Sequence, residues 1–119
     1  MVSRLSDEQL DLVFRALADA TRRDIVRRTL TRELSVSGLA ADYEMSFAAV
    51  QKHVAVLERA GFVRKTTSGR ERLVRAVPGQ LARARACLER LEALWRHRLD
   101  GLDAVLADRS DPTDPQQPE

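Results

Sequence analysis

The chain has 119 residues and a net charge of +2, and this length suits one compact domain with its own core. Its single cysteine, Cys87, excludes an internal disulfide, and with only His53 and His97 beside it the chain is poor in soft metal ligands. The sequence has neither an apolar run long enough to span a membrane nor the pattern of a secretory signal. We therefore expect a cytoplasmic protein.

The first half of the chain has the pattern of four amphipathic helices, each preceded by a residue that favours a helix N-terminus. These residues are Ser6, which forms a capping box with Gln9, and then Asp19, Ser35 and Ser46. The four apolar stripes are Leu10, Val13, Phe14 and Leu17; Ile25, Val26 and Leu30; Val36, Leu39 and Ala40; and Val50, Val54 and Leu57. In the second helix Arg22, Arg23, Arg27 and Arg28 are expected to face solvent. The last two helices, joined by residues 42–45, predict a helix-turn-helix.

After Gly61, a suitable left-handed helix stop, the pattern changes to that of β-strands. Two β-prone runs, 62–67 and 70–77, flank Ser68-Gly69, a pair that favours a tight turn. We interpret this segment as a β-hairpin, or wing. Because an isolated hairpin is marginally stable, it should pack on the helices, with the inward residues Phe62, Val63, Leu73 and Val77.

Residues 81–107 predict one long helix whose apolar residues recur every three or four positions: Leu88, Leu91, Trp95, Leu99, Leu102 and Leu106. This stripe is longer than so small a body can cover, so we expect a partner helix against it. Residues 108–119 contain three prolines and no large apolar residue. We therefore expect a domain at residues 1–107 and a disordered, acidic, proline-rich tail at residues 108–119.

The charge of the chain is unevenly distributed. Residues 51–75 carry seven basic side chains and two acidic ones, whereas the rest of the chain is net acidic. A basic segment of this kind is expected on a surface that neutralises phosphates. A plain solvated face would show the same charges, so charge alone does not decide between the two interpretations.

Residues 12–77 resemble the ArsR-type winged-helix repressors. The resemblance is carried by ALADATRR at 16–23, ELSVSGLA at 33–40 and MSFAAVQKHVAVLERAGFV at 45–63. It implies a mainly α fold with a β-hairpin wing, about five helices and a long C-terminal dimerisation helix. It also implies a symmetric dimer joined by the first and last helices, with the fourth helix in the major groove of DNA and the wing beside the duplex.

This chain departs from the metal-sensing members of that family. They carry two cysteines in the third helix, where this chain has Ser35 and Ser37, and serine is a poor ligand for soft metals. The last helix offers only His97 near Asp100 and Asp103, which is fewer ligands than a sensor site needs. We expect no metal site and no cofactor.

The residues that we expect to contact DNA are Ser46, Phe47, Ala48, Gln51 and Lys52 on the fourth helix and Lys65, Arg70 and Arg72 on the wing. Gln51 can pair with adenine, and Lys52 can reach guanine or a phosphate. His53 lies beside the apolar stripe and suits a half-buried packing role better than base reading. The expected dimer interface comprises Leu10, Phe14, Leu88, Leu91, Trp95, Leu99 and Leu102.

Together these features predict a homodimeric, sequence-specific transcriptional regulator that represses its own or a neighbouring operon from an imperfect inverted repeat in double-stranded DNA. An enzyme is not expected, because the chain has no phosphate-binding glycine loop, no paired-carboxylate motif and no nucleophile near a base. A winged-helix module that binds only proteins would share the fold. Salt-dependent binding of duplex DNA distinguishes it from a regulator.

Overall fold

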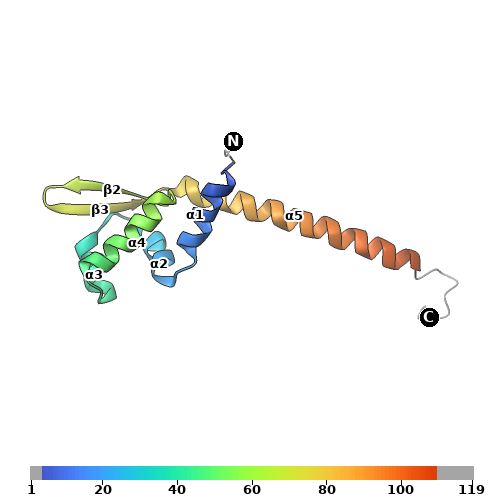
Figure 1. Ribbon diagram of the computed structural model, residues 1–119, viewed down its shortest axis with the longest axis horizontal. Helices are drawn as coiled ribbons and strands as arrows, with labels where there is room; N and C mark the ends of the chain where they lie inside the picture. Colours follow the sequence, from blue (N-terminus) through green and yellow to red (C-terminus); the bar gives the residue numbers. More distant parts are fainter. Residues whose placement is uncertain (1–3, 110–119) are drawn as a thin grey trace. The chain divides into compact units, whose positions relative to one another are not determined.

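The computed structural model describes residues 4–109. The elements in chain order are α1 (Asp7–Leu17), α2 (Ala20–Thr29), β1 (Leu34–Ser35), α3 (Val36–Tyr43), α4 (Phe47–Arg59), β2 (Val63–Ser68), β3 (Glu71–Ala76) and α5 (Pro78–Arg109) (Figure 1). The predicted winged helix-turn-helix, with five helices and a long last helix, is therefore confirmed. Residues 4–85 and 86–109 form two separate units. The predicted tail begins within the last turn of α5, and residues 110–119 lie outside the described part.

The core of the first unit is apolar and draws on every helix and on the sheet. Its fully buried members include Val13, Ile25, Val36, Leu39, Val50, Val54, Leu57, Phe62 and Val74. The stripes predicted for the first four helices thus supply most of it. Leu30 is an exception, because α2 ends at Thr29 and the side chain of Leu30 is exposed. Thr29 takes the buried position and donates its hydroxyl to the Ile25 carbonyl at 2.7 Å.

The prediction that the arginines of α2 face solvent is wrong for Arg22 and Arg28, which are half-buried. Arg22 donates from Nε to the Ala16 carbonyl and from a terminal nitrogen to the Arg15 carbonyl, both at 2.8 Å. The exposed Arg23 donates to the Leu17 carbonyl at 2.7 Å. The last carbonyls of a helix lack partners within it, so α2 provides the donors that complete the C-terminus of α1.

The turn between α3 and α4 is set by backbone geometry. Glu44 adopts a left-handed conformation with φ of 54°, and its N–H bonds to carbonyls at the end of α3. The Met45 N–H reaches the Ala40 carbonyl at 3.0 Å, and the Met45 side chain packs on the core. Ser46 then caps α4 by accepting from the Ala49 N–H at 3.1 Å. Because each step is hydrogen-bonded, the start of α4 is fixed relative to α3.

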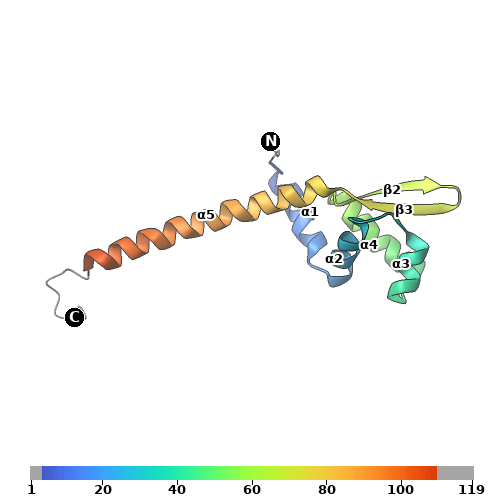
Figure 2. The ribbon, with the colours of Figure 1, turned by 180° about the vertical axis from the view of Figure 1, so that it is seen from behind.

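The wing belongs to a three-stranded antiparallel sheet in the order β1-β3-β2. Seen from the opposite side, the hairpin runs beside α3 and α4 (Figure 2). Ser68 pairs with Glu71, so the turn is Gly69-Arg70 and not the predicted Ser68-Gly69. The buried residues of β3 are Val74 and Ala76, whereas the predicted Leu73 is only half-buried. The short strand β1, which was not predicted, pairs with Leu73 and Val74 and ties the wing to the helices.

A close contact joins the end of α4 to the start of α5, which begins at Pro78, three residues earlier than predicted. Proline suits the first position of a helix. The side chain of Gln80 is buried and donates from Nε2 to the Ala60 carbonyl at 2.7 Å. Gly61 has φ of 83°, and a Cβ placed there would lie 2.7 Å from the Gln80 Nε2. We call Ala60, Gly61 and Gln80 the α4–α5 junction.

We expect Gly61→Ala to destabilise the protein by more than the ~1 to 2 kcal/mol that a left-handed conformation costs a residue with a Cβ, because the new methyl group also collides with Gln80. Gly69→Ala is the matched control, since Gly69 has φ of 62° and open space around it. Urea unfolding of both variants measures the difference. Equal losses of stability would show that the collision with Gln80 carries no cost.

Candidate nucleic-acid interface

Helix α4 has one buried face and one exposed face. Val50, Val54 and Leu57 are completely buried, which turns the opposite side of the helix outward. Of the predicted contact residues, Ser46, Phe47, Ala48 and Lys52 are exposed and Gln51 is half-buried. Phe47 exposes 46% of its surface at the first helical position, which is unusual for a large aromatic residue. The structure thus gathers these five residues on the first two turns of α4.

On the wing, Arg70 lies in the turn and Arg72 follows on β3, and both side chains are exposed. Lys65 is placed differently. It is half-buried, and its Nζ lies 3.5 Å from a carboxylate oxygen of Glu58 on α4. This ion pair joins β2 to the end of α4. It offsets the charge of Lys65, which the sequence analysis predicted to contact DNA.

A polar cluster that the sequence did not predict joins α2 to α3. The Tyr43 hydroxyl donates to Asp24 at 2.5 Å, and Asp24 also pairs with Arg27. Both contacts lower the pKa of Asp24, the Tyr43 hydroxyl contributing most. Arg28 pairs with Asp42 at 2.6 Å and lies 5.4 Å from the centre of the Tyr43 ring. The cluster holds α3, and with it the start of α4, against the helical body.

His53 is half-buried, as the sequence predicted, on the side of α4 that meets the α1–α2 corner. Its Nδ1 lies 3.4 Å from a guanidinium nitrogen of Arg22. Nearby, Asp19 caps α2 by accepting from the Arg22 N–H at 3.0 Å, a bond that lowers the pKa of this carboxyl. Arg22 therefore contacts both the C-terminus of α1 and the middle of α4.

The second unit, residues 86–109, is helical and exposes large apolar side chains along its length. Leu88, Leu91, Leu94, Trp95, Leu99, Leu102, Val105 and Leu106 are each about half exposed or more, and Trp95 exposes 65%. Of the interface residues predicted on α1, Leu10 and Phe14 are both half-buried. An exposed apolar face of this extent is typical of a protein interaction site.

The serines at the metal-sensor positions have other surroundings. Ser35 caps α3, accepting from the Gly38 N–H at 3.0 Å, and Ser37 is exposed. Among residues 4–109, no group of three or more potential metal-ligating side chains lies together. No helix in this range is long and apolar enough to cross a membrane.

Comparison with known proteins identifies the family. Residues 19–65, which contain α2, α3, α4 and the start of the wing, match the arsR family of bacterial regulatory proteins. The HTH-type transcriptional regulator Rv2034 of Mycobacterium tuberculosis is 36% identical over 103 residues, which cover 87% of this chain and 94% of that protein. The chain belongs to the ArsR family of transcriptional regulators.

Solved structures of regulators share the fold. An ArsR-like transcriptional regulator from Rhodococcus sp. RHA1 is 33% identical and superposes with a TM-score of 0.78, covering 85% of this chain and 93% of that one. A homodimeric winged helix-turn-helix DNA-binding domain, Mb0332 of Mycobacterium bovis, has a TM-score of 0.57 at 20% identity, covering 82% and 93% of the two chains. This ArsR-family chain is thus a transcriptional regulator with a winged helix-turn-helix DNA-binding domain, and not an enzyme.

We expect Tyr43→Phe to destabilise the protein by about 1 to 2 kcal/mol at neutral pH. This is near or below the lower end of the range for a hydrogen bond to a charged group, because the pair is partly exposed. Folding lowers the pKa of Asp24, so its contribution is complete above the ordinary aspartate pKa of about 4 and is lost as the pH falls through the lower pKa of the folded state. The penalty should therefore shrink below pH 4.

Thermal unfolding between pH 2.5 and 7 measures this dependence. In an Asp24→Asn background, Tyr43→Phe should cost clearly less, because the ionised acceptor is already absent. A penalty that does not change with pH, or that is the same in both backgrounds, would contradict the assigned role of the pair.

Proposed function

We propose that the chain is a homodimeric repressor that binds an imperfect inverted repeat in its own or a neighbouring operon, in the cytoplasm. The observation that supports this most directly is the outward side of α4, where Lys52 is exposed and Gln51 is half-buried, together with the exposed Arg70 in the turn of the wing. A small regulator that covers its operator blocks transcription without further machinery.

In this proposal α4 enters the major groove. The exposed N–H groups of the first turn, after Ser46, suit a phosphate oxygen. Gln51 pairs with the edge of adenine, Lys52 reaches guanine or a phosphate, and Phe47 or Ala48 contacts a thymine methyl group. Arg70 and Arg72 contact phosphate or the minor groove. Lys65 contributes less than the two arginines, because Glu58 already pairs with it and offsets its charge.

The second copy covers the apolar face of residues 86–109. Leu88, Leu91, Trp95, Leu99 and Leu102 follow one another at steps of three or four residues, which places them on one side of the helix. A second copy of the same helix supplies a matching stripe. The half-buried Leu10 and Phe14 of α1 complete the interface. The homodimeric state of the Mycobacterium bovis domain is consistent with this arrangement.

A two-fold dimer presents two copies of α4 to one side of the duplex. The two helices must enter successive major grooves, ~34 Å or about 10 base pairs apart, so the operator is an inverted repeat. A module that binds only proteins would have no such requirement. Binding of duplex DNA that weakens steeply with salt separates the regulator from that alternative.

The roles of two side chains can be distinguished on the operator selected from genomic DNA fragments. Gln51→Ala should weaken operator binding by ~1 to 3 kcal/mol per half-site and relax the preference at one base pair, because a base-edge contact carries sequence information. Arg70→Ala should weaken binding to all sequences alike and reduce the slope of log affinity against log salt by about 1 per subunit, as expected for a lost phosphate contact.

Fluorescence anisotropy on the operator and on a scrambled duplex, across a range of salt concentrations, measures both effects. Thr67→Ala is the matched control on the wing, because Thr67 is exposed and uncharged. The base-reading role of Gln51 fails if its variant loses equal affinity for both duplexes. The phosphate role of Arg70 fails if its variant keeps the salt slope of the wild type.

We expect Trp95→Ala to destabilise the dimer, because each truncated indole in a core-like interface costs ~3 to 5 kcal/mol. His97→Ala, on the polar side of the same helix, is the control and should leave the association unchanged. Sedimentation velocity at decreasing concentration measures both variants. A wild-type chain that sediments as a folded monomer at micromolar concentration would contradict the proposed dimer.

A further inference from the structure

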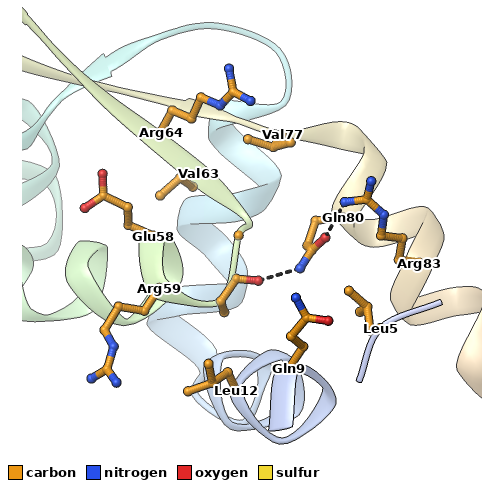
Figure 3. Close-up of a pocket in the computed structure, with 12 residues that line it drawn as sticks. Leu5, Gln9, Leu12, Glu58, Arg59, Val63, Arg64, Val77, Gln80 and Arg83 are labelled. Carbon is orange, nitrogen blue, oxygen red and sulfur yellow. Dashed lines mark hydrogen bonds between the residues drawn. The ribbon is translucent and has the colours of Figure 1, made fainter. Parts of the chain in front are cut away.

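A cavity of about 370 Å³ lies in the first unit, beside the α4–α5 junction. Its walls come from α1, the end of α4, the start of β2 and the start of α5 (Figure 3). Leu5, Leu12, Val63 and Val77 provide an apolar lining, and Gln9, Gln80 and Arg83 are its central polar side chains. This volume and mixture are typical of sites that bind small molecules.

At the centre of this cavity each side-chain amide oxygen already accepts one hydrogen bond, whereas several N–H donors are left over. Gln9 accepts from the Ser6 N–H through Oε1 at 2.8 Å, and its amide nitrogen points toward Gln80 (Figure 3). Gln80 accepts from Arg83 through Oε1 at 3.1 Å, and its Nε2 donates one N–H to the Ala60 carbonyl. N–H groups are therefore available on Gln9, Gln80 and Arg83, and an anionic ligand can accept hydrogen bonds from them.

The charges around the cavity agree with an anion. Arg59 and Arg64 belong to its lining, but their guanidinium groups point away from Gln80, whereas the Arg83 guanidinium lies beside Gln80 (Figure 3). Within the described residues, none of these three has a carboxylate within 4.0 Å. Glu58, the one acidic residue of the lining, points away from Gln80 and pairs with Lys65 (Figure 3). Arg83 thus supplies the positive charge beside the amide donors, and an apolar wall adjoins them.

We propose that this cavity binds a small organic carboxylate with an apolar body, and that the bound anion weakens operator binding. The carboxylate accepts from Arg83 and from the amides of Gln9 and Gln80, and its apolar part lies against Leu5 and Leu12. Drawing Gln80 toward the anion loosens its bond to Ala60, the residue that ends α4. The regulatory part rests on the proposed function, since it requires that α4 bind DNA.

The binding test uses hexanoate and phenylacetate, with hexanamide, phenylacetamide and inorganic phosphate as controls, added to the full-length ¹⁵N-labelled protein. The two carboxylates should shift the side-chain amide signals of Gln9 and Gln80 saturably below about 10 mM, whereas the neutral amides should not. Arg83→Gln should weaken carboxylate binding about tenfold or more, because a charge-assisted contact is lost. Arg83→Lys should retain part of it.

A second variant keeps the test valid if the Arg83→Gln protein fails to fold. Leu5 lies outside α1 and is half-buried at the cavity wall, so Leu5→Trp fills the space and should abolish the shifts while the remaining spectrum stays dispersed. Equal shifts from amides and carboxylates, equal shifts from phosphate alone, or shifts unaffected by either variant would overturn the site.

Operator binding is measured first without any carboxylate and then with saturating hexanoate. Hexanoate should raise the Kd of the wild type for the operator at least threefold and should leave the Kd of Leu5→Trp unchanged. If the protein without carboxylate fails to bind DNA, the proposed function fails, whatever the spectra show. If it binds DNA and hexanoate independently, the site stands and its regulatory role is wrong.

Discussion

Burial of one side of α4 is the constraint on which the rest of the interface depends. Val50, Val54 and Leu57 have no exposed surface, and together they give up ~5 to 8 kcal/mol if the helix leaves the core. A rotation of α4 about its axis would expose them, so the helix has one stable orientation. The side chains on the opposite face are held outward by this apolar packing and need no contacts of their own to be positioned.

Polar contacts then fix the ends of the helices, where apolar packing is less specific. The N-termini of α1, α2, α3 and α4 are capped by a serine or an aspartate. Arg22 completes the end of α1, and Gln80 completes the end of α4. Each of these bonds contributes only ~0.5 to 1.5 kcal/mol. Their main effect is on geometry, because a capping bond determines where the chain enters and leaves its helix.

The helices, their caps and the presence of a wing could be predicted because each has a local signal. The period of apolar residues marks the buried face, and serine or aspartate marks the N-terminus. The register of the wing has no such signal. The observed turn at Gly69-Arg70 pairs Val63 with Ala76 and Lys65 with Val74. Because paired residues share a face, Val74 and Ala76 lie with Val63 on the buried face, and Leu73 lies on the other face.

Contacts between distant segments were also missed, for the same reason. Tyr43 and Asp24, or Arg22 and His53, meet only after the helices pack. The pairing of Lys65 with Glu58 likewise depends on how β2 lies on α4. An arginine-rich helix suggests a solvated surface when only its sequence is known. One local signal was available for Arg22 and Arg23. They follow closely after the first predicted helix, whose last carbonyls require donors.

The short strand β1 divides the wing into two parts with different stiffness. It pairs only with Leu73 and Val74, so the outer pairs of the hairpin, from Thr67 and Arg72 to the turn, have no third strand beside them. A two-stranded ribbon of this kind twists easily. In the proposed complex the tip can therefore follow grooves of different width while the base remains attached to the core. If the wing contacts DNA as proposed, its tolerance for the shape of the flanking duplex is separated from the rigid placement of α4, and each can change through mutation without disturbing the other.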